Sequence, residues 1–275
     1  MAGQERYLEL ADIAAGQWGM VTAAQAATVN VTAQQLTRLA GRGMLHRLQH
    51  GVYRLAGVPN DTQADLKAAW LAIEPAVTAG ERLENSDPGA IVSHRSAARV
   101  HRLGDIDADI NEFSTTVTRR SRQPSLRFHK RTLPRADWTV IDGLPVTTVA
   151  ATLRDLAATS TDGGHLAVAV RDALLHGQVR YAEVAALLRP YAADYGAPLG
   201  GGEALLRMFL EQAGLRRVTK VADRLGPEWL REQIDTAGMK FRTAEIIGDV
   251  AWRIAAQQEL DEFSGTFGNS PQAQP

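Results

Sequence analysis

Polar and basic side chains of the types that recognise nucleic acids are concentrated in one segment near the N-terminus. Arg38 stands out, because an exposed guanidinium in the middle of a helix can donate to both O6 and N7 of guanine. Gln34 and Thr37 lie close to it in the chain. The full set of candidate contact residues is Thr32, Gln34, Gln35, Thr37, Arg38, Arg42, Arg47, His50 and Arg54. The chemistry that they offer is hydrogen bonding to base edges and to phosphates.

Two capping boxes must position these side chains. Thr22 precedes Gln25 by three residues, and Thr32 precedes Gln35 by three. In each pair the hydroxyl accepts a hydrogen bond from an amide of the first helical turn, while the glutamine reaches back to the capping residue. Gln35 is therefore assigned first to capping, and Thr32 can offer a phosphate its amide or hydroxyl while it caps. The predicted helices cover residues 23–28 and 33–42.

A glycine stop and a basic hairpin follow the second helix. Gly41 and Gly43 end it, and residues 44–48 and 52–55 alternate apolar and polar as strands do. The order helix, helix, hairpin predicts a winged helix-turn-helix, in which the second helix enters the DNA major groove. The residues predicted to contact phosphates are Arg42, Arg47, His50 and Arg54. An alternative stays open, because some winged helices serve only protein contact or dimerisation.

A second basic stretch lies further along the chain. It contains Arg119, Arg120, Arg122, Arg127, Lys130 and Arg131. One interpretation is an auxiliary surface for phosphates or for an acidic partner, and the other is a solvated loop between two strands. The residues alone do not decide between these two interpretations.

Histidines are the first candidates for metal binding or acid–base work. His94 and His101 are seven residues apart and His129 is remote, so no pair has the i, i+4 spacing of a helical metal site. We therefore expect ordinary surface or core histidines. Ser93 and His94 are adjacent and are expected to point in different directions, which argues against a catalytic pair.

Other catalytic patterns are weak or missing. Asp105, Asp107 and Asp109 alternate, which fits a solvent-facing strand edge better than a cation site. Gly200–Gly202 lacks the lysine and the serine or threonine that a phosphate-binding loop requires. The sequence holds 0 cysteines, which removes thiol catalysis and thiolate metal sites. We predict no enzyme activity, no cofactor and no metal.

Composition and charge set wider limits. The 275 residues are 45% hydrophobic and 22% charged, which is typical of globular proteins. The net charge is −1, but the first 58 residues have a net charge of +2, and four of their five basic residues, all except Arg6, lie within the predicted motif. No apolar run is long enough to span a membrane, and no charged-then-apolar leader opens the chain. A cytoplasmic protein is expected.

The expected fold is α+β, with an N-terminal winged helix-turn-helix followed by a larger mixed α+β domain. An acidic helical segment and a clear turn cluster separate the two domains. Within the second domain, residues 215–222 are predicted to form a possible strand. The last residues have few apolar side chains to bury. The predicted boundaries are 1–58 for the winged helix, 59–89 for an acidic helical linker, 90–262 for the α+β domain and 263–275 for a disordered tail.

Several of these stretches resemble the AbiEi-type antitoxins of type IV toxin–antitoxin systems. The resemblance covers roughly the first two thirds of the chain. The stretches that carry it are VTAAQA from Val21, GVYRL from Gly51, VSHRSAA from Val92, HKR from His129, DGLPVTT from Asp142 and LRDLA from Leu153.

The resemblance implies a DNA-binding repressor of its own operon that also counteracts a nucleotidyltransferase toxin. In that family the winged helix binds operator repeats, and the C-terminal domain is tied to antitoxin activity. The matching motif places residues 32–42 and the hairpin on double-stranded DNA. It identifies no residue that contacts the toxin.

A rival hypothesis is a DNA reader fused to a degenerate or active endonuclease-like domain. Related proteins with the same front half carry a small nuclease domain. Here the chain after Glu203 lacks a convincing order of Glu, Asp and Glu-x-Lys, which disfavours the nuclease.

Overall fold

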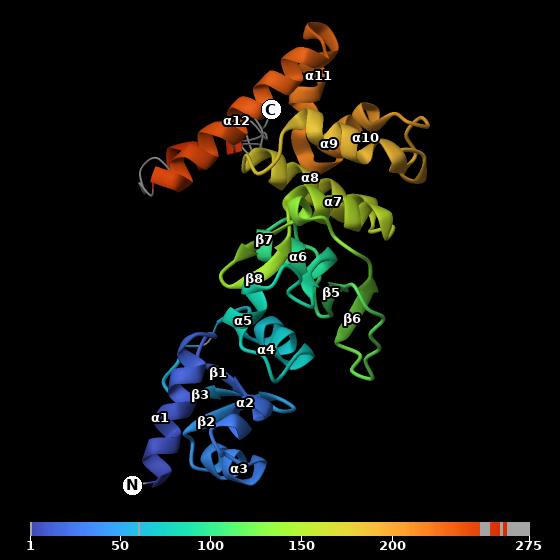
Figure 1. Ribbon diagram of the computed structural model, residues 1–275. Helices are drawn as coiled ribbons and strands as arrows, with labels where there is room; N and C mark the ends of the chain where they lie inside the picture. The colour runs from blue at the N-terminus through green and yellow to red at the C-terminus, as the bar shows by residue number, and fades with distance from the viewer. Residues whose placement is uncertain (1, 60, 248–253, 259–260, 263–275) are drawn as a thin grey trace, which may run out of the picture. The chain divides into compact units, whose positions relative to one another are not determined.

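The computed structural model describes the chain except for residues 1, 60, 248–253, 259–260 and 263–275, so the predicted disordered tail lies outside the described residues. The chain forms two compact units (Figure 1). The first unit comprises residues 1–96 and 109–146, and the second comprises residues 97–108 and 147–275.

The N-terminal part of the first unit has helices and strands in the order of a winged helix-turn-helix. Its three strands form an antiparallel sheet in the order β1-β3-β2. A compact apolar core, which includes the fully buried Leu10, Val21 and Leu36, joins the helices to this sheet. The elements are α1 (Ala2–Ala15), β1 (Met20–Thr22), α2 (Ala23–Thr28), α3 (Ala33–Gly41), β2 (Leu45–Gln49) and β3 (Val52–Leu55).

Both predicted capping boxes are present, and they explain where α2 and α3 begin. The Thr22 hydroxyl accepts a hydrogen bond from the backbone N–H of Gln25 at 3.1 Å, and the Thr32 hydroxyl accepts one from the backbone N–H of Gln35 at 3.3 Å. The reciprocal bonds from each threonine amide to the glutamine side chain are also made. Helix α3 ends where Gly43 adopts a φ of +73°, a conformation that glycine tolerates without strain.

Residues 59–89, the predicted acidic helical linker, contain two helices. They form α4 (Ala64–Ile73) and α5 (Ala79–Glu84), which pack within the first unit. The buried Lys67 ammonium forms ion pairs with Asp61 and with Asp142, a residue far along the chain. The Trp18 ring lies 6.1 Å from that of Trp70 in an edge-to-face contact. These contacts join the N-terminal helices and hairpin to the later strands, and all of these elements lie in the first compact unit.

A five-stranded mixed sheet completes the first unit. Its order is β6-β5-β4-β8-β7, with β4 antiparallel to β5, and with β4–β8 and β5–β6 parallel. The predicted Asp142–Gly143 hairpin turn is present, with a φ of +47° and +75° at its two residues. The strands are β4 (Ile91–Val92), β5 (Asn111–Thr115), β6 (Leu126–Lys130), β7 (Trp138–Ile141) and β8 (Leu144–Thr147).

The second unit is helical. Helix α8 supplies much of its core through fully buried apolar side chains such as Leu166, Val170 and Leu174. Helix α12 crosses the end of α8 at Gly238, where a Cβ would lie 2.3 Å from the carbonyl oxygen of Leu174. Helix α6 (His94–His101) runs across the boundary between the units. The remaining helices are α7 (Val149–Ala158), α8 (Gly163–Leu175), α9 (Tyr181–Leu188), α10 (Gly202–Leu210), α11 (Arg216–Leu225) and α12 (Pro227–Ile247).

The possible strand at residues 215–222 is wrong, because these residues belong to α11 and to the turn before it. A π-helical turn at Glu211–Leu215 contains Gly214 at a φ of +100°, which ends one helix and lets the next begin in a new direction. The predicted fold class is confirmed: an N-terminal arrangement compatible with a winged helix precedes a larger α+β region.

Candidate nucleic-acid interface

Helix α3 presents the predicted reading residues to solvent. Gln34, Thr37 and Arg38 are exposed, whereas Leu36 points into the core and is 0% exposed. The guanidinium of Arg38 is therefore outside the hydrophobic interior. A helix with one buried stripe and one exposed polar face can lie in a groove without losing its own packing.

Thr32 and Gln35 form the cap at the N-terminus of α3. The Thr32 amide donates to Gln35 Oε1 at 2.7 Å, and the Gln35 side chain is only half-exposed. Gln35 is thus committed to positioning the helix, as its spacing predicted. Thr32 remains exposed at the N-terminus of α3, where backbone amides favour an anion.

The β2–β3 hairpin carries Arg47 and His50 on its exposed surface. Arg47 Nη2 lies 3.2 Å from His50 Nδ1, and Arg47 Nε donates to the Gln49 carbonyl at 3.4 Å. The two side chains therefore lie together near the turn. Arg54 is half-buried in the central strand β3, opposite Met20 and His46, which makes it less accessible than the other predicted phosphate contacts.

A shallow groove of about 180 Å³ runs between α1 and α3. Its lining includes Arg38 of α3 and Arg42, the residue that follows α3, together with Arg6 and Tyr7 from α1. Leu10, Val31, Gln35 and Leu39 complete the lining. Arg6 was absent from the predicted contacts, because nothing in its local pattern shows that α1 places it beside α3.

The basic stretch from Arg119 to Arg131 divides into two sets. Arg119, Arg127 and Arg131 are engaged within the first unit: Arg119 donates to Glu74 at 2.9 Å, Arg127 to Glu112 at 3.3 Å and Arg131 Nε to the Ser114 hydroxyl at 2.8 Å. The other set is exposed and consists of Arg120, Arg122 and Lys130. The stretch is therefore only partly a solvated loop.

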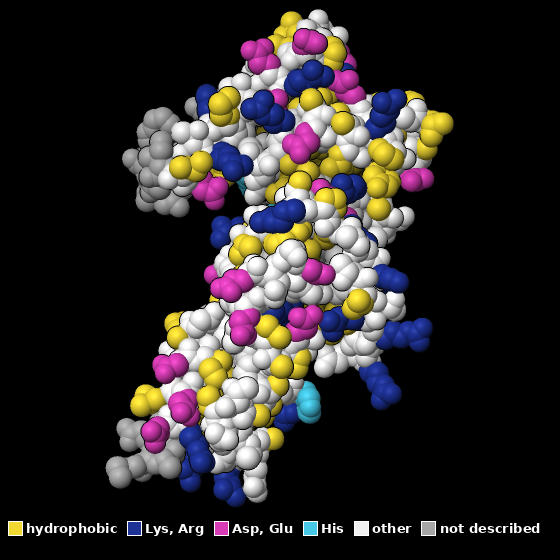
Figure 2. All heavy atoms as spheres, in the orientation of Figure 1, with side chains coloured by type: hydrophobic (Ala, Val, Ile, Leu, Met, Phe, Trp, Pro, Cys, Tyr) yellow, Lys and Arg dark blue, Asp and Glu magenta, His cyan; other side chains and the backbone are white. Residues whose placement is uncertain are grey.

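The loop between β5 and β6 shares a groove of about 470 Å³ with the end of β2 and with α4. Gln49 at the end of β2 lines this groove together with Arg119–Gln123, and Gln49 also donates to the Ala68 carbonyl of α4 at 2.7 Å. Figure 2 shows basic side chains around α3 and again around the β5–β6 loop. The exposed arginines of the loop thus belong to the same compact unit as the hairpin.

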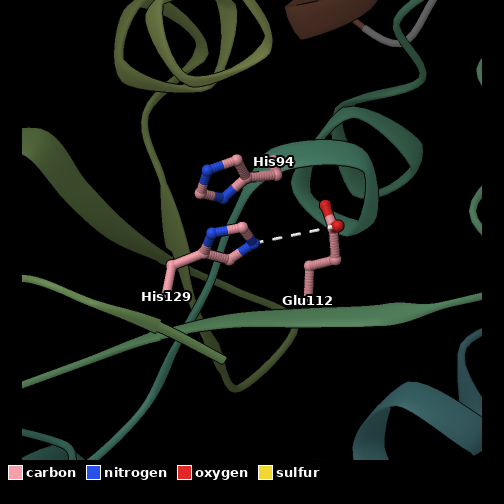
Figure 3. A group of neighbouring side chains, drawn as sticks. All are labelled: His94, Glu112 and His129. Atoms are coloured by element: carbon pink, nitrogen blue, oxygen red, sulfur yellow. Dashed lines mark ion pairs between the residues drawn. The ribbon is translucent and has the colours of Figure 1, made fainter. Parts of the chain in front are cut away.

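Two histidines that seemed remote in the sequence are brought together. The rings of His94, at the start of α6, and His129, on β6, are stacked with centroids 3.6 Å apart (Figure 3). Glu112 of β5 lies beside them, with its Oε1 3.8 Å from His129 Nε2. Glu112 and His129 come close because β5 and β6 are paired in parallel, with Ser114, two residues after Glu112, opposite His129. His101 belongs to the second unit.

Burial controls the charge of this cluster. Burial, aided by the neighbouring His129, lowers the pKa of His94 to about 3, so its imidazole is neutral at pH 7. Burial alone would raise the pKa of Glu112, but His129 and the Arg95 amide outweigh it and lower that pKa below its usual value. The Arg95 amide donates to Glu112 Oε2 at 3.1 Å.

Two smaller expectations need correction. Ser93 and His94 do not point apart: the Ser93 hydroxyl lies 2.9 Å from His94 Nδ1, because His94 adopts a φ of +54° and turns its side chain back. The three aspartates are solvent-facing as expected, but they lie on a loop and not on a strand, with Asp105 2.9 Å from His165 Nδ1.

The comparison with protein families supports the reading of the N-terminal segment. Residues 9–56 match the family model described as transcriptional regulator, AbiEi antitoxin. The matched segment contains the second half of α1 and all of α2, α3 and the hairpin. The resemblance to the AbiEi-type antitoxins is thereby confirmed for this segment. No curated protein matches the chain.

Proposed function

We propose that the chain is a DNA-binding transcriptional repressor of its own operon and the antitoxin of a type IV toxin–antitoxin pair. The observation that carries the proposal is the exposed polar face of α3, which has Arg38 at its centre within a segment that matches a regulator family. The fold presents this face on a capped helix, next to a basic hairpin. This is the arrangement with which a winged helix reads a major groove.

The proposed division of labour follows from accessibility. Gln34, Thr37 and Arg38 read base edges, because their side chains lie on the exposed side of α3. Thr32, Arg42, Arg47 and His50 contact phosphates, which fixes the register of the helix but carries no sequence information. Arg54 and Gln35 support this surface from half-buried positions. Double-stranded DNA bearing operator repeats is the proposed ligand.

The exposed set Arg120, Arg122 and Lys130 extends this surface in the proposal. Its loop shares a groove with Gln49 of the hairpin, so phosphates beyond the recognition site come within its reach. The engaged arginines, Arg119, Arg127 and Arg131, serve mainly to hold the loop and β6 in place.

The antitoxin role rests on the family match together with the resemblance of the later stretches. The proposed partner is a nucleotidyltransferase toxin, and the proposed location is the cytoplasm. No helix in the described part of the chain is long and apolar enough to cross a membrane. The family description favours a regulator over an enzyme.

Binding of the full chain to the DNA upstream of its own gene tests the repressor role. Fluorescence anisotropy measures binding to that duplex and to a scrambled duplex between about 50 and 200 mM salt. At a salt concentration that abolishes binding to the scrambled duplex, the chain should still bind the upstream duplex. Equal affinity for the two duplexes would contradict sequence-specific repression. Cleavage of a plasmid by the chain with Mg²⁺ would favour the nuclease hypothesis instead.

Co-expression tests the antitoxin role separately. The chain should restore growth to cells that express the nucleotidyltransferase encoded beside it. A variant in which Arg38 and Arg47 are both alanine should still restore growth if antitoxin activity resides outside the winged helix. Failure of the unaltered chain to restore growth would contradict the antitoxin role and leave DNA binding standing.

A further inference from the structure

The cluster of His94, Glu112 and His129 is not part of the proposed DNA interface. Its three side chains come from α6, β5 and β6 and converge on one place, as Figure 3 shows. One nitrogen or oxygen from each lies within 4.8 Å of the others. His94 is 5% exposed and Glu112 is 3% exposed, so the two donors are largely removed from water.

We propose that His94, Glu112 and His129 bind one divalent transition-metal ion of the zinc type. Two imidazoles and one carboxylate are a donor set that suits Zn²⁺ and leaves at least one coordination position for water. The proposal concerns a site distinct from the DNA-reading surface and does not depend on DNA binding.

The spacing of His129 and Glu112 fits an ion between them. The 3.8 Å from His129 Nε2 to Glu112 Oε1 is too long for a hydrogen bond, and this buried nitrogen has no hydrogen-bond partner. A Zn²⁺ ion at about 2.1 Å from each atom would separate them by roughly 3.4 Å at a tetrahedral angle and by at most roughly 4.2 Å. The observed distance lies between these limits.

Surrounding hydrogen bonds hold two of the three ligands in place. The Arg95 amide donates to Glu112 Oε2, which leaves Oε1 on the side of His129. The Ser93 hydroxyl lies 2.9 Å from His94 Nδ1 and is itself 2.9 Å from the Ser114 hydroxyl. Outer contacts of this kind orient metal ligands and fix the tautomer of a ligating histidine.

Two adjustments accompany binding. Imidazole lone pairs lie in the ring plane, so two rings that are 14° from parallel and 3.6 Å apart cannot both point at one ion. One ring must therefore rotate out of the stack. The Arg127 side chain, which is 55% exposed, must also leave Glu112 Oε1, and it can swing into solvent. Because the positive charges of Arg127 and Arg131 repel a metal cation, we expect zinc to bind more weakly here than at a structural zinc site.

Metal titration of the full chain, without a polyhistidine tag and after removal of bound metal with a chelator, tests the site. Calorimetry should show one Zn²⁺ bound per chain. His129→Gln and Glu112→Gln should each weaken binding by at least about tenfold. His129 is partly exposed, so its replacement should leave the fold intact, which circular dichroism can verify. His46→Gln, at an exposed histidine of β2 outside both proposed sites, is the matched control and should bind zinc like the unaltered chain.

Imidazole resonances give a second readout. Zinc should shift the signals of His94 and His129 and leave those of the other five of the chain's 7 histidines in place. No zinc uptake by the intact chain, undiminished uptake by His129→Gln, or shifts spread over all histidines would each overturn the proposal.

Discussion

Arg38 is the residue on which sequence recognition is expected to depend most. Its guanidinium is exposed in the middle of α3, where a bidentate contact with guanine is possible. Arg38→Ala should cost about 1–3 kcal/mol of binding to the specific duplex and relax discrimination at one base pair. Competition binding against a panel of single-base operator variants measures this. An equal loss on specific and random DNA would contradict a base-reading role.

Arg47 should behave differently, because its side chain lies on the hairpin next to His50 and is proposed to contact a phosphate. Arg47→Ala should weaken all sequences to a similar extent and reduce the slope of log affinity against log salt by about one. A salt series with specific and random duplexes gives both numbers. Arg135→Ala, in an arginine that stacks on Trp138, is a control with no expected change in slope.

Individual residues also differ in whether their roles could be predicted from the sequence. The exposure of Arg38 followed from helical periodicity, and the capping role of Gln35 followed from its distance to Thr32. The cluster of His94, Glu112 and His129 did not follow from any spacing, because the parallel strands β5 and β6 bring Glu112 and His129 together and the start of α6 adds His94. A local pattern carries information about neighbours in a helix or a hairpin, but not about which strands become partners.

At the scale of elements, the two capping boxes should differ in their contribution to stability. Thr32→Ala removes one cap and should lower the free energy of unfolding by about 1 kcal/mol. Thr22→Ala removes a cap and also the hydrogen bond from its hydroxyl to the Pro75 carbonyl, which is part-buried. It should therefore cost about 1 kcal/mol more. Urea denaturation of both variants measures the difference, and equal losses would contradict the added role of Thr22.

Elements with strong local signals were predicted well. The structure has α2 at Ala23–Thr28, as the first capping box predicted, and the hairpin strands lie within a residue of their predicted ends. Strand β1 was missed, because three residues before a helix cap leave almost no alternating pattern. The start of α11 was mistaken for a strand, because the short apolar pattern there fits both the periodicity of a helix and that of a strand. The turn at Gly214 that separates two helices has no strong local signal.

At the scale of the whole molecule, stability should depend on pH through buried histidines of the second unit. Burial lowers the pKa of His101, and its hydrogen bond with the Thr147 carbonyl only partly offsets this. The unfolded chain, in which the pKa is near the ordinary value of about 6.5, then binds more protons than the folded chain below that pH. The contribution is fully present above about pH 6.5 and is lost as the pH falls.

His101→Gln should flatten this dependence. The glutamine amide can still donate to the Thr147 carbonyl, but it does not titrate. The slope of unfolding free energy against pH below pH 6.5 should decrease by at most about 1.4 kcal/mol per pH unit. Urea denaturation at a series of pH values compares the two proteins. His50→Gln, on the exposed hairpin, is the control, and the same slope for the unaltered chain and His101→Gln would contradict the assignment.

The organisation into two units connects the charge pattern with the proposed function. The chain as a whole carries a net charge of −1, and exposed basic side chains lie around α3 and around the β5–β6 loop of the first unit. The predicted division at residue 58 followed the end of the hairpin. In the structure, Lys67, Trp70 and the later strands belong to the same compact unit as the N-terminal helices and hairpin. Long-range ion pairs and aromatic contacts of this kind produce no recognisable spacing of residues in a sequence, so they cannot be predicted from it.

Site-specific photo-crosslinking gives the most direct test of the claim that α3 and the hairpin dock on a duplex. A photoreactive residue replaces Gln34 on α3 in one variant and the exposed Lys220 on α11 of the second unit in another. We predict a crosslink from position 34 to the upstream duplex that an excess of the same unlabelled duplex abolishes, and no comparable crosslink from position 220. A crosslink from position 220 with none from position 34 would contradict the account.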